Sequence, residues 1–178
     1  MTNSVGMQYA SAIFDLAYEK KCVTDYYQAL DVINTVIKDE DISKVFMHPS
    51  ITLDAKKEIL KKSISTEIDE TLLNFLYVLL DNNRLFDLPL IVVAYKELLN
   101  KYENVIEVNL YYKYPLTDEQ RVEVKDKLSN YYQKKVVLHE ILDDSLIGGI
   151  KITTAGEVLD VSVLSSLSNL KNSLKKGW

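Results

Sequence analysis

The sequence predicts an N-terminal all-α six-helix bundle followed by a small α+β domain with the order β-α-β-β-α. Three observations support this fold class. Residues 1–104 contain six stretches with helical spacing of apolar residues, separated by short breaks. From residue 105 the apolar residues alternate, as they do in strands. Charge changes at the same place, because residues 1–104 carry eleven basic and sixteen acidic side chains and residues 105–178 carry ten of each. We therefore expect two domains, 1–104 and 105–178.

The composition of the 178-residue chain excludes several classes of protein. With 47% hydrophobic and 26% charged residues, it can build an ordinary globular core. A net charge of −5 argues against a nucleic-acid partner, which requires a clustered basic face. The single cysteine, Cys22, excludes an intrachain disulfide. No apolar run approaches the roughly 20 residues of a membrane span, and the first residues lack the features of a signal peptide. We expect a soluble intracellular protein with no direct membrane span.

The first predicted helix covers residues 5–21 and is unusually apolar. Its polar positions, including Gln8 and Asp15, make one narrow stripe. A surface helix needs an apolar arc of only about 100° or somewhat more. The wider arc here indicates either a central helix of the bundle or an apolar flank that a partner covers.

Three further helices are predicted before residue 63. Residues 24–38 have one apolar face, and a short helix follows through Met47. Pro49 ends it, because the residue before a proline disfavours the helical conformation. Thr52 is then a plausible N-cap for a lysine-rich helix whose charged side we interpret as a solvated face, with an acidic partner as the alternative.

Residues 69–82 form the second unusually apolar helix, in which Asn74 interrupts an otherwise apolar run. A last helix of the bundle starts at Leu88-Pro89 and runs to about Tyr102. The short connections predict a compact arrangement.

The second half starts with a strand over Val105–Tyr112, where β-forming residues alternate. Thr117 and Gln120 then match a capping box, in which each side chain bonds the other residue's backbone. The helix that this box opens is expected to end near Tyr132.

The remaining elements are shorter. We predict strands over Val136–Leu142 and Gly148–Thr154, and a hairpin turn leads from the second of these into Val158–Val161. Ser162 can cap a last helix, whose inner face would carry leucines and valines. The order of elements predicts helices packed against one sheet.

The sequence contains no recognisable catalytic, cofactor-binding or metal-binding site. Adjacent aspartates, Asp143 and Asp144, point to opposite sides of an extended chain, so a turn role is more economical than metal binding. Gly148 and Gly149 match no phosphate-binding loop and more plausibly permit a bulge or close backbone approach. His48 and His139 have no metal-ligand partners at suitable spacing.

Three motifs, in one order along the chain, resemble a known family. The first is Tyr9-Ala10-Ser11-Ala12-Ile13-Phe14, and the second is Asn74-Phe75-Leu76 followed by Asn82-Asn83-Arg84-Leu85 and Leu88-Pro89. The third comprises Asp143, Ser145, Leu146, Ile147, Gly148, Gly149, Asp160 and Ser162. Together they resemble the delta subunit of bacterial F-type ATP synthases, whose mitochondrial counterpart is the oligomycin-sensitivity-conferring protein.

This resemblance implies a non-catalytic stator connector without cofactors, on the cytoplasmic face of the bacterial membrane. The first domain would bind the catalytic head, where its first and fifth helices receive the N-terminal helix of an alpha subunit. The second domain would bind the peripheral-stalk b subunit. The residues expected to line the groove for the alpha-subunit helix are Tyr9, Ala10, Ile13, Phe14, Ala17, Leu72, Phe75, Leu76 and Leu79.

Two other functions remain open from the residues alone. A generic helical adaptor would also be acidic and lack a chemical site. A small metal-dependent enzyme would have to use the Asp143-Asp144 and Gly148-Gly149 region.

Overall fold

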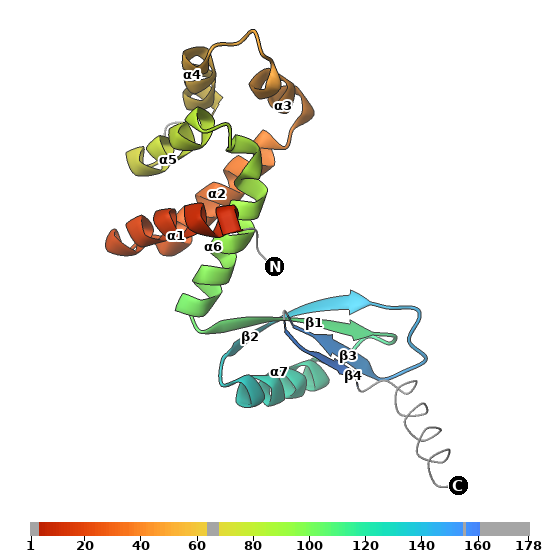
Figure 1. The fold of residues 1–178 in the computed structure, drawn as a ribbon. Helices are drawn as coiled ribbons and strands as arrows, with labels where there is room; N and C mark the ends of the chain where they lie inside the picture. Colours follow the sequence, from red (N-terminus) through yellow and green to blue (C-terminus); the bar gives the residue numbers. More distant parts are fainter. Residues whose placement is uncertain (1–3, 64–67, 155, 161–178) are drawn as a thin grey trace, which may run out of the picture. The chain divides into compact units, whose positions relative to one another are not determined.

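The computed structural model describes residues 4–63, 68–154 and 156–160 (Figure 1). The chain divides into two compact units, Met1–Leu99 and Asn100–Trp178. The first is helical and the second is a small α/β domain, which agrees in outline with the predicted fold class.

The helices of the N-terminal part begin and end close to their predicted limits. They are α1 (Ser4–Glu19), α2 (Val23–Ile37), α3 (Glu40–Met47), α4 (Leu53–Ser63), α5 (Glu70–Asp81), the short 3-10 helix η1 (Leu85–Asp87) and α6 (Leu88–Tyr102). The Asp39 side chain caps α3 by accepting hydrogen bonds from the backbone N–H groups of Asp41 and Ile42. Thr52 Oγ1 accepts one from the Ala55 N–H at 3.4 Å, so it acts as the predicted cap of α4.

Several helices are followed by a residue in the left-handed conformation. Lys21, Asn83 and Asn104 lie two residues after α1, α5 and α6 and have φ angles of 58°, 57° and 54°. Such a residue turns the chain so that the next N–H bonds back into the last helical turn. After α1, the Cys22 N–H donates to the Ala17 carbonyl at 3.0 Å. The direction in which the chain leaves α1 is therefore determined locally.

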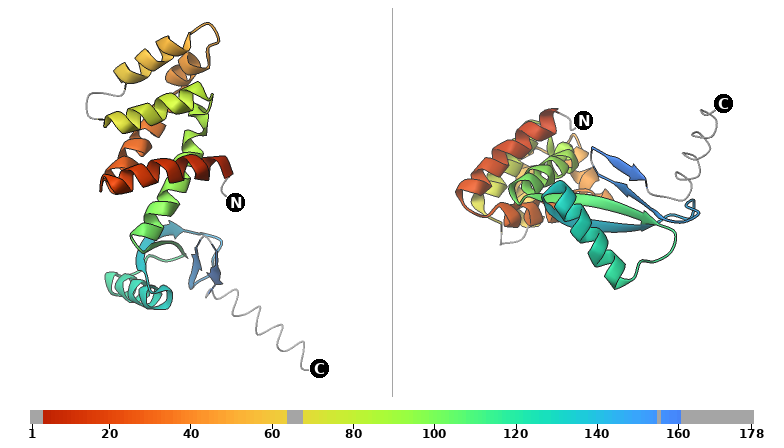
Figure 2. Two further views of the ribbon diagram at one scale, coloured as in Figure 1. Left: turned by 60° about the vertical axis from the view of Figure 1, so that its left-hand side comes forward. Right: turned by 90° about the horizontal axis from the view of Figure 1, so that it is seen from below.

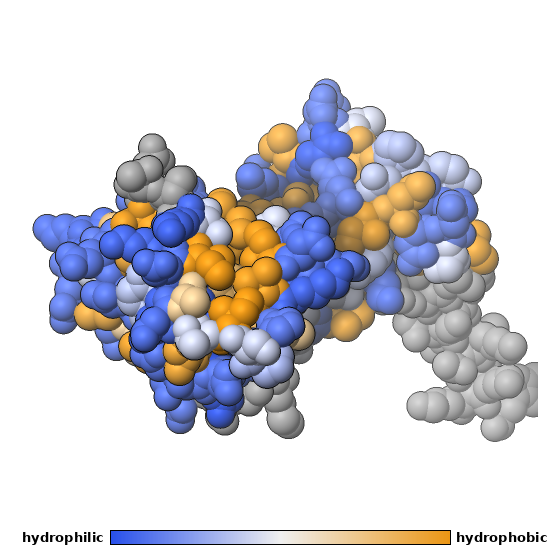
Figure 3. All heavy atoms as spheres, turned by 90° about the horizontal axis from the view of Figure 1, so that it is seen from above, coloured by the Kyte–Doolittle hydropathy of each residue, from blue (hydrophilic) through white to orange (hydrophobic). Residues whose placement is uncertain are grey.

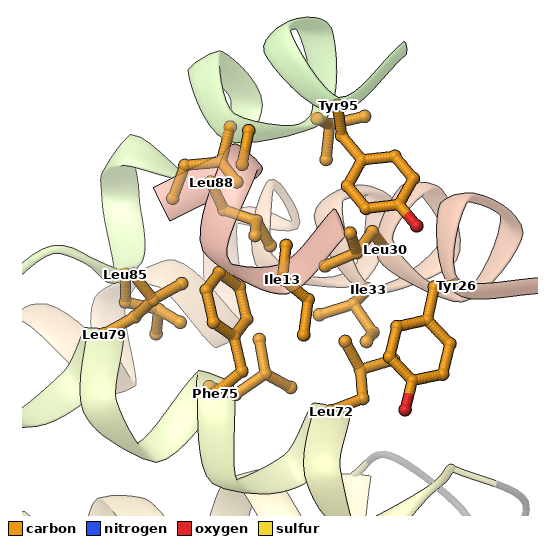
Figure 4. Close-up of a cluster of buried hydrophobic side chains, with 14 of the residues drawn as sticks. Ile13, Tyr26, Leu30, Ile33, Leu72, Phe75, Leu79, Leu85, Leu88 and Tyr95 are labelled. Atoms are coloured by element: carbon orange, nitrogen blue, oxygen red, sulfur yellow. The ribbon is translucent and has the colours of Figure 1, made fainter. Parts of the chain in front are cut away.

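The core of the first unit is built mainly from α1, α2, α5 and α6, with η1 contributing (Figure 4). Its labelled members in Figure 4 are Ile13, Tyr26, Leu30, Ile33, Leu72, Phe75, Leu79, Leu85, Leu88 and Tyr95. Tyr95 is fully buried, and its hydroxyl donates to the Val23 carbonyl at 2.9 Å. This bond satisfies the one polar atom that the ring carries into the core.

Helix α1 approaches α6 closely at Gly6. A Cβ atom at this position would lie 3.3 Å from both the Cβ and the carbonyl oxygen of Leu90. Glycine therefore permits the two helices to cross at this distance.

The second unit contains a four-stranded mixed sheet with α7 on one face (Figure 2). Its elements are β1 (Val105–Tyr112), α7 (Asp118–Tyr132), β2 (Lys135–Leu142), β3 (Ile150–Thr153) and β4 (Val158–Asp160). The strand order is β2-β1-β3-β4, with β1 and β2 parallel and the other pairs antiparallel. Parallel pairing of β1 and β2 requires a crossover, which α7 supplies.

The sheet and α7 share a separate core. Val108 and Leu110, alternate residues of β1, are fully buried and belong to one cluster with Leu128 of α7. The predicted capping box is present: the Gln120 N–H donates to Thr117 Oγ1 at 3.2 Å, and the Thr117 N–H donates to Gln120 Oε1 at 3.0 Å.

Two details of the second unit differ from prediction. The described residues contain one strand more than the order β-α-β-β-α, because the predicted hairpin continues into β4 as a full member of the sheet. Strand β3 begins at Ile150 rather than Gly148, since Gly149 has a φ of 81° and lies outside the strand region. The helix expected after Ser162 lies outside the described residues.

Candidate functional site

Most of the residues expected to line the partner groove are buried in the first unit. Those with at most 8% exposure are Ala10, Ile13, Ala17, Leu72, Phe75, Leu76 and Leu79. Tyr9 and Phe14 are half-buried. In Figure 4, Ile13, Leu72 and Phe75 point into the space between α1 and α5 and contribute to the core that joins these helices.

The structure brings Tyr9 and Phe75 together across the two helices. Their rings meet edge to face with centroids 6.3 Å apart, a favourable geometry for aromatic pairs. Phe14 lies on the other flank of α1, where its ring packs against Tyr95 of α6 at 5.3 Å. Phe14 therefore does not join Tyr9 on the flank that faces α5.

Beside the buried core positions, a stripe of mostly half-buried or exposed residues runs along each of these two helices, with the buried Phe75 at the inner edge of the stripe on α5. On α1, Ala12 and Leu16 follow Tyr9 by three and seven residues, which places all three on one side. On α5, Thr71 precedes Phe75 by four residues and Val78 follows it by three, so these residues share one side of the helix. The contact between Tyr9 and Phe75 shows that the two sides face each other, and Figures 1 and 2 show α1 and α5 side by side. Leu16 and Val78 are 42% and 46% exposed. We call this surface the α1–α5 seam, and it consists of Tyr9, Ala12, Leu16, Thr71, Phe75 and Val78.

Four of the six seam residues were missed by the sequence analysis, namely Ala12, Leu16, Thr71 and Val78. Helical offsets of three and seven residues from Tyr9, and of four and three residues on either side of Phe75, would have found them. That signal needs the knowledge that Tyr9 and Phe75 face each other, which the sequence does not contain.

Polar side chains close one end of the seam. Lys20 Nζ lies 2.6 Å from Asp69 Oδ2 and donates to Thr71 Oγ1, also at 2.6 Å. The Tyr26 hydroxyl donates to the same Asp69 oxygen. The hydrogen bonds from Lys20 and then Tyr26 hold the pKa of Asp69 below its usual range. Burial, and then the bond to Asp69, raise the pKa of Tyr26 to about 12. We call these four residues the Asp69 cluster.

A second apolar patch lies around α3, the start of α4 and η1. Met47, Leu53 and Phe86 are 62%, 49% and 40% exposed. Leu53 and Phe86 border a hollow of about 20 Å³, which is room for about one water molecule. Figure 3 shows exposed apolar side chains gathered between hydrophilic ones on one face of the molecule.

The two aspartates considered as a metal site, Asp143 and Asp144, both make contacts within the turn that they belong to or close to it. Asp143 Oδ1 accepts hydrogen bonds from the backbone N–H of Ser145 at 2.9 Å and from its hydroxyl at 2.5 Å. These bonds hold the pKa of Asp143 below its usual range. Asp144 pairs with Lys113 at 2.9 Å. The two carboxylates therefore fix the turn after β2 rather than converging on one point.

The rest of this signature segment shapes the same turn. Leu146 is buried, Ile147 is 60% exposed, and Gly149 supplies the left-handed residue before β3. Asp160 ends β4 opposite Lys151, and Ser162 lies outside the described residues.

The other groups that could take part in chemistry are dispersed. His139 Nε2 lies 3.5 Å from Glu107, and His48 Nδ1 accepts from the Ser50 N–H at 3.2 Å. The Cys22 thiol is half-buried and donates to the Ala17 carbonyl at 3.7 Å. Within the described ranges, no group of three or more His, Cys, Asp or Glu side chains is arranged to hold a metal ion. Each helix in the same ranges is too short or too polar to cross a membrane.

Known proteins resemble the chain along nearly its whole length. The profile of the family described as "ATP synthase delta (OSCP) subunit" matches residues 5–174. The ATP synthase subunit delta of Clostridium botulinum strain Langeland is 33% identical over 170 residues, which are 95% of each chain. That of Clostridioides difficile strain 630 is 32% identical over 178 residues, covering 99% of this chain and 98% of the relative. A chain in the cryo-EM structure of the Toxoplasma gondii mitochondrial ATP synthase hexamer shares the fold, with a TM-score of 0.70 and 24% identity, and the match covers 97% of this chain and 98% of that chain.

Proposed function

Because the chain belongs to the ATP synthase delta (OSCP) subunit family, we propose that it ties the catalytic head of the F-type ATP synthase to the membrane-anchored peripheral stalk. It is a non-catalytic, structural subunit of the stator of that enzyme. Rotation of the central shaft during proton-driven ATP synthesis exerts torque on the head, and this connector resists that torque. Its own residues bind no nucleotide and move no protons.

The two halves of the chain divide this work. The N-terminal part, residues 1–104, acts as a six-helix bundle that binds the head, and residues 105–178 bind the peripheral-stalk b subunit. The complex holds the chain as a peripheral protein at the cytoplasmic face of the bacterial membrane. Support comes from the family match, which spans both halves, and from the separate core of each unit.

The α1–α5 seam is the surface of the N-terminal part that fits the N-terminal helix of an alpha subunit. Leu16 and Val78 expose large apolar side chains on neighbouring helices. Tyr9 and Phe75 contact each other through their rings between the same two helices. An amphipathic helix laid along the seam would bury these side chains, and removal of apolar surface from water would drive binding. The buried residues Ala10, Ile13, Ala17, Leu72, Leu76 and Leu79 support the seam from beneath rather than touch the partner.

The test titrates a peptide of the alpha-subunit N-terminal segment from the same organism into the full-length chain by calorimetry and NMR. We expect Leu16→Glu to weaken binding by tenfold or more, since the partner helix would bury an unpaired carboxylate, and tenfold corresponds to about 1.4 kcal/mol. Val32→Glu is the matched control, because Val32 is 65% exposed and belongs to α2, which contributes no residue to the seam. The control should bind like the wild type.

Two results would contradict the proposal. Absence of binding to the wild-type chain would remove the alpha-subunit helix as partner. Chemical-shift changes that avoid α1 and α5 would move the binding surface elsewhere. A generic helical adaptor would show no selective affinity for this peptide, and the family match over residues 5–174 does not favour that alternative.

A further inference from the structure

Asp69 occupies the N-cap position of α5 but does not cap it. Its φ of −55° and ψ of 138° suit an N-cap, yet its side chain accepts no capping hydrogen bond from a backbone N–H in the first turn of the helix. Aspartate is among the best N-cap residues because its carboxylate normally accepts such a bond. Here the local preference is overridden, and the carboxylate is held by residues far away in the sequence.

Three elements meet at this single carboxylate. Lys20 directly follows α1, Tyr26 lies on α2, and both bond Asp69 Oδ2 at the start of α5. The left-handed residue Lys21 sets the course of the chain just after Lys20. Lys20 also bonds Thr71, which belongs to the seam itself. The Asp69 cluster therefore joins the end of α1 to the beginning of α5.

Apolar packing alone does not close this end of the unit. An open hollow of about 360 Å³ lies there, bordered by Cys22, Ala29 and Leu72 as well as by Lys20, Tyr26 and Asp69. Figure 4 shows Tyr26 and Leu72 extending toward each other from α2 and α5. At this end of α5, the hydrogen bonds to Asp69 therefore act beside the hollow, in addition to the packing of the buried Leu72.

We propose that Asp69 is a positioning residue for the α1–α5 seam: by holding Lys20 and Tyr26, it fixes the start of α5 against the end of α1. Thr71 and Phe75 lie in the first two turns of α5, so displacement of its start moves these seam residues relative to Tyr9 and Leu16. This inference rests on the proposed function, in which the seam receives the partner helix.

The variant Asp69→Ser separates positioning from capping. Serine is as good an N-cap as aspartate, but it lacks the charge that holds Lys20. If Asp69 positions α5, the variant should bind the alpha-subunit peptide on the order of tenfold more weakly than the wild-type full-length chain. The control is Asp81→Ser, which breaks the 2.6 Å ion pair of α5 with Lys57 of α4 at the other end of the helix. The control should keep wild-type affinity.

A distance measurement tests the same point without the peptide. Spin labels at Asp15 and Asn74, both exposed, are introduced in a Cys22→Ser background, and the distance between α1 and α5 is recorded. We expect a broadened or shifted distribution in Asp69→Ser and an unchanged one in Asp81→Ser.

The combined results distinguish the possible failures. If the wild type does not bind the peptide, the proposed function fails, and the spin-label distances alone decide whether Asp69 positions α5. If Asp69→Ser keeps both the affinity and the distance, the positioning role is overturned. Weaker binding with an unchanged distance would also overturn it, because Asp69 would then contact the partner directly.

Discussion

At the scale of single residues, Tyr26 shows how burial and a tertiary contact change the chemistry of one side chain. Its ring is only 4% exposed, and its hydroxyl donates to Asp69. Both effects favour the protonated phenol, so the folded protein raises the pKa of Tyr26 to about 12. An unperturbed tyrosine in the unfolded chain ionises near pH 10.

The sign of the resulting pH dependence follows from this difference. A raised pKa contributes stability that is complete below about pH 10 and is lost as the pH rises through about 12. Between pH 9 and pH 11, we expect the free energy of unfolding to fall more in the wild type than in Tyr26→Phe, by on the order of 1 kcal/mol. Urea denaturation at pH 9 and pH 11 measures the difference. Parallel losses in both proteins would show that Tyr26 does not titrate in this way.

At the scale of elements, the stability of helix α7 depends more on the interactions at its N-terminal end than on the packing along its length. Only Leu128 is buried among its 15 residues, so packing contributes less to the stability of this helix than it does for α1 or α5. Its first turn carries Asp118 and Glu119, whose negative charges interact favourably with the positive end of the helix dipole. Arg121 bonds both Asp118 and Glu140 of β2 and thereby ties this end to the sheet.

Removal of the capping box should therefore be measurable. We expect Thr117→Ala to lower the free energy of unfolding by about 1 kcal/mol, because the Gln120 N–H loses the hydroxyl that accepts its hydrogen bond. Thr35→Ala is the control: Thr35 lies within α2, bonds the Asp31 carbonyl and caps nothing. Chemical denaturation followed by circular dichroism compares the two. Equal effects of both changes would contradict a specific role for the cap.

At the scale of the whole molecule, the chain is stabilised by two cores that share no residue. The first joins helices, and the second joins α7 to the sheet. A stator connector must hold two partners at once, and separate cores allow each binding surface to be stabilised by its own packing.

Core substitutions should accordingly act within one unit. We expect Leu76→Ala, at a fully buried position of α5, to cost about 2–5 kcal/mol through cavity formation. Amide hydrogen exchange should show the loss of protection in the helical unit and leave β1 unaffected. Leu110→Ala is the reciprocal variant, because Leu110 is fully buried in the sheet. Loss of protection in both units from either change would contradict independent cores.

The candidate site illustrates where prediction from sequence stopped. The resemblance to the delta-subunit family selected the two helices that carry the seam, and both have apolar arcs wider than one packing face needs. It then chose mainly the inward residues, such as Ile13 and Leu76, which are fully buried. Periodicity reports how much of a helix is apolar, but not which neighbour covers each part of it. Asp69 gave no signal at all, since its partners Lys20 and Tyr26 are more than 40 residues away.

By itself, the sequence determined the local structure and the family. Strand β1 and helix α7 have the limits that were predicted, because alternation and the Thr117 capping box act between residues close in the chain. Only the tertiary structure decided the strand order β2-β1-β3-β4, the flank of α1 that faces α5 and the contacts of Asp69. Each of these depends on contacts between distant segments, and such contacts are selected by the packing of the whole unit rather than by any local preference.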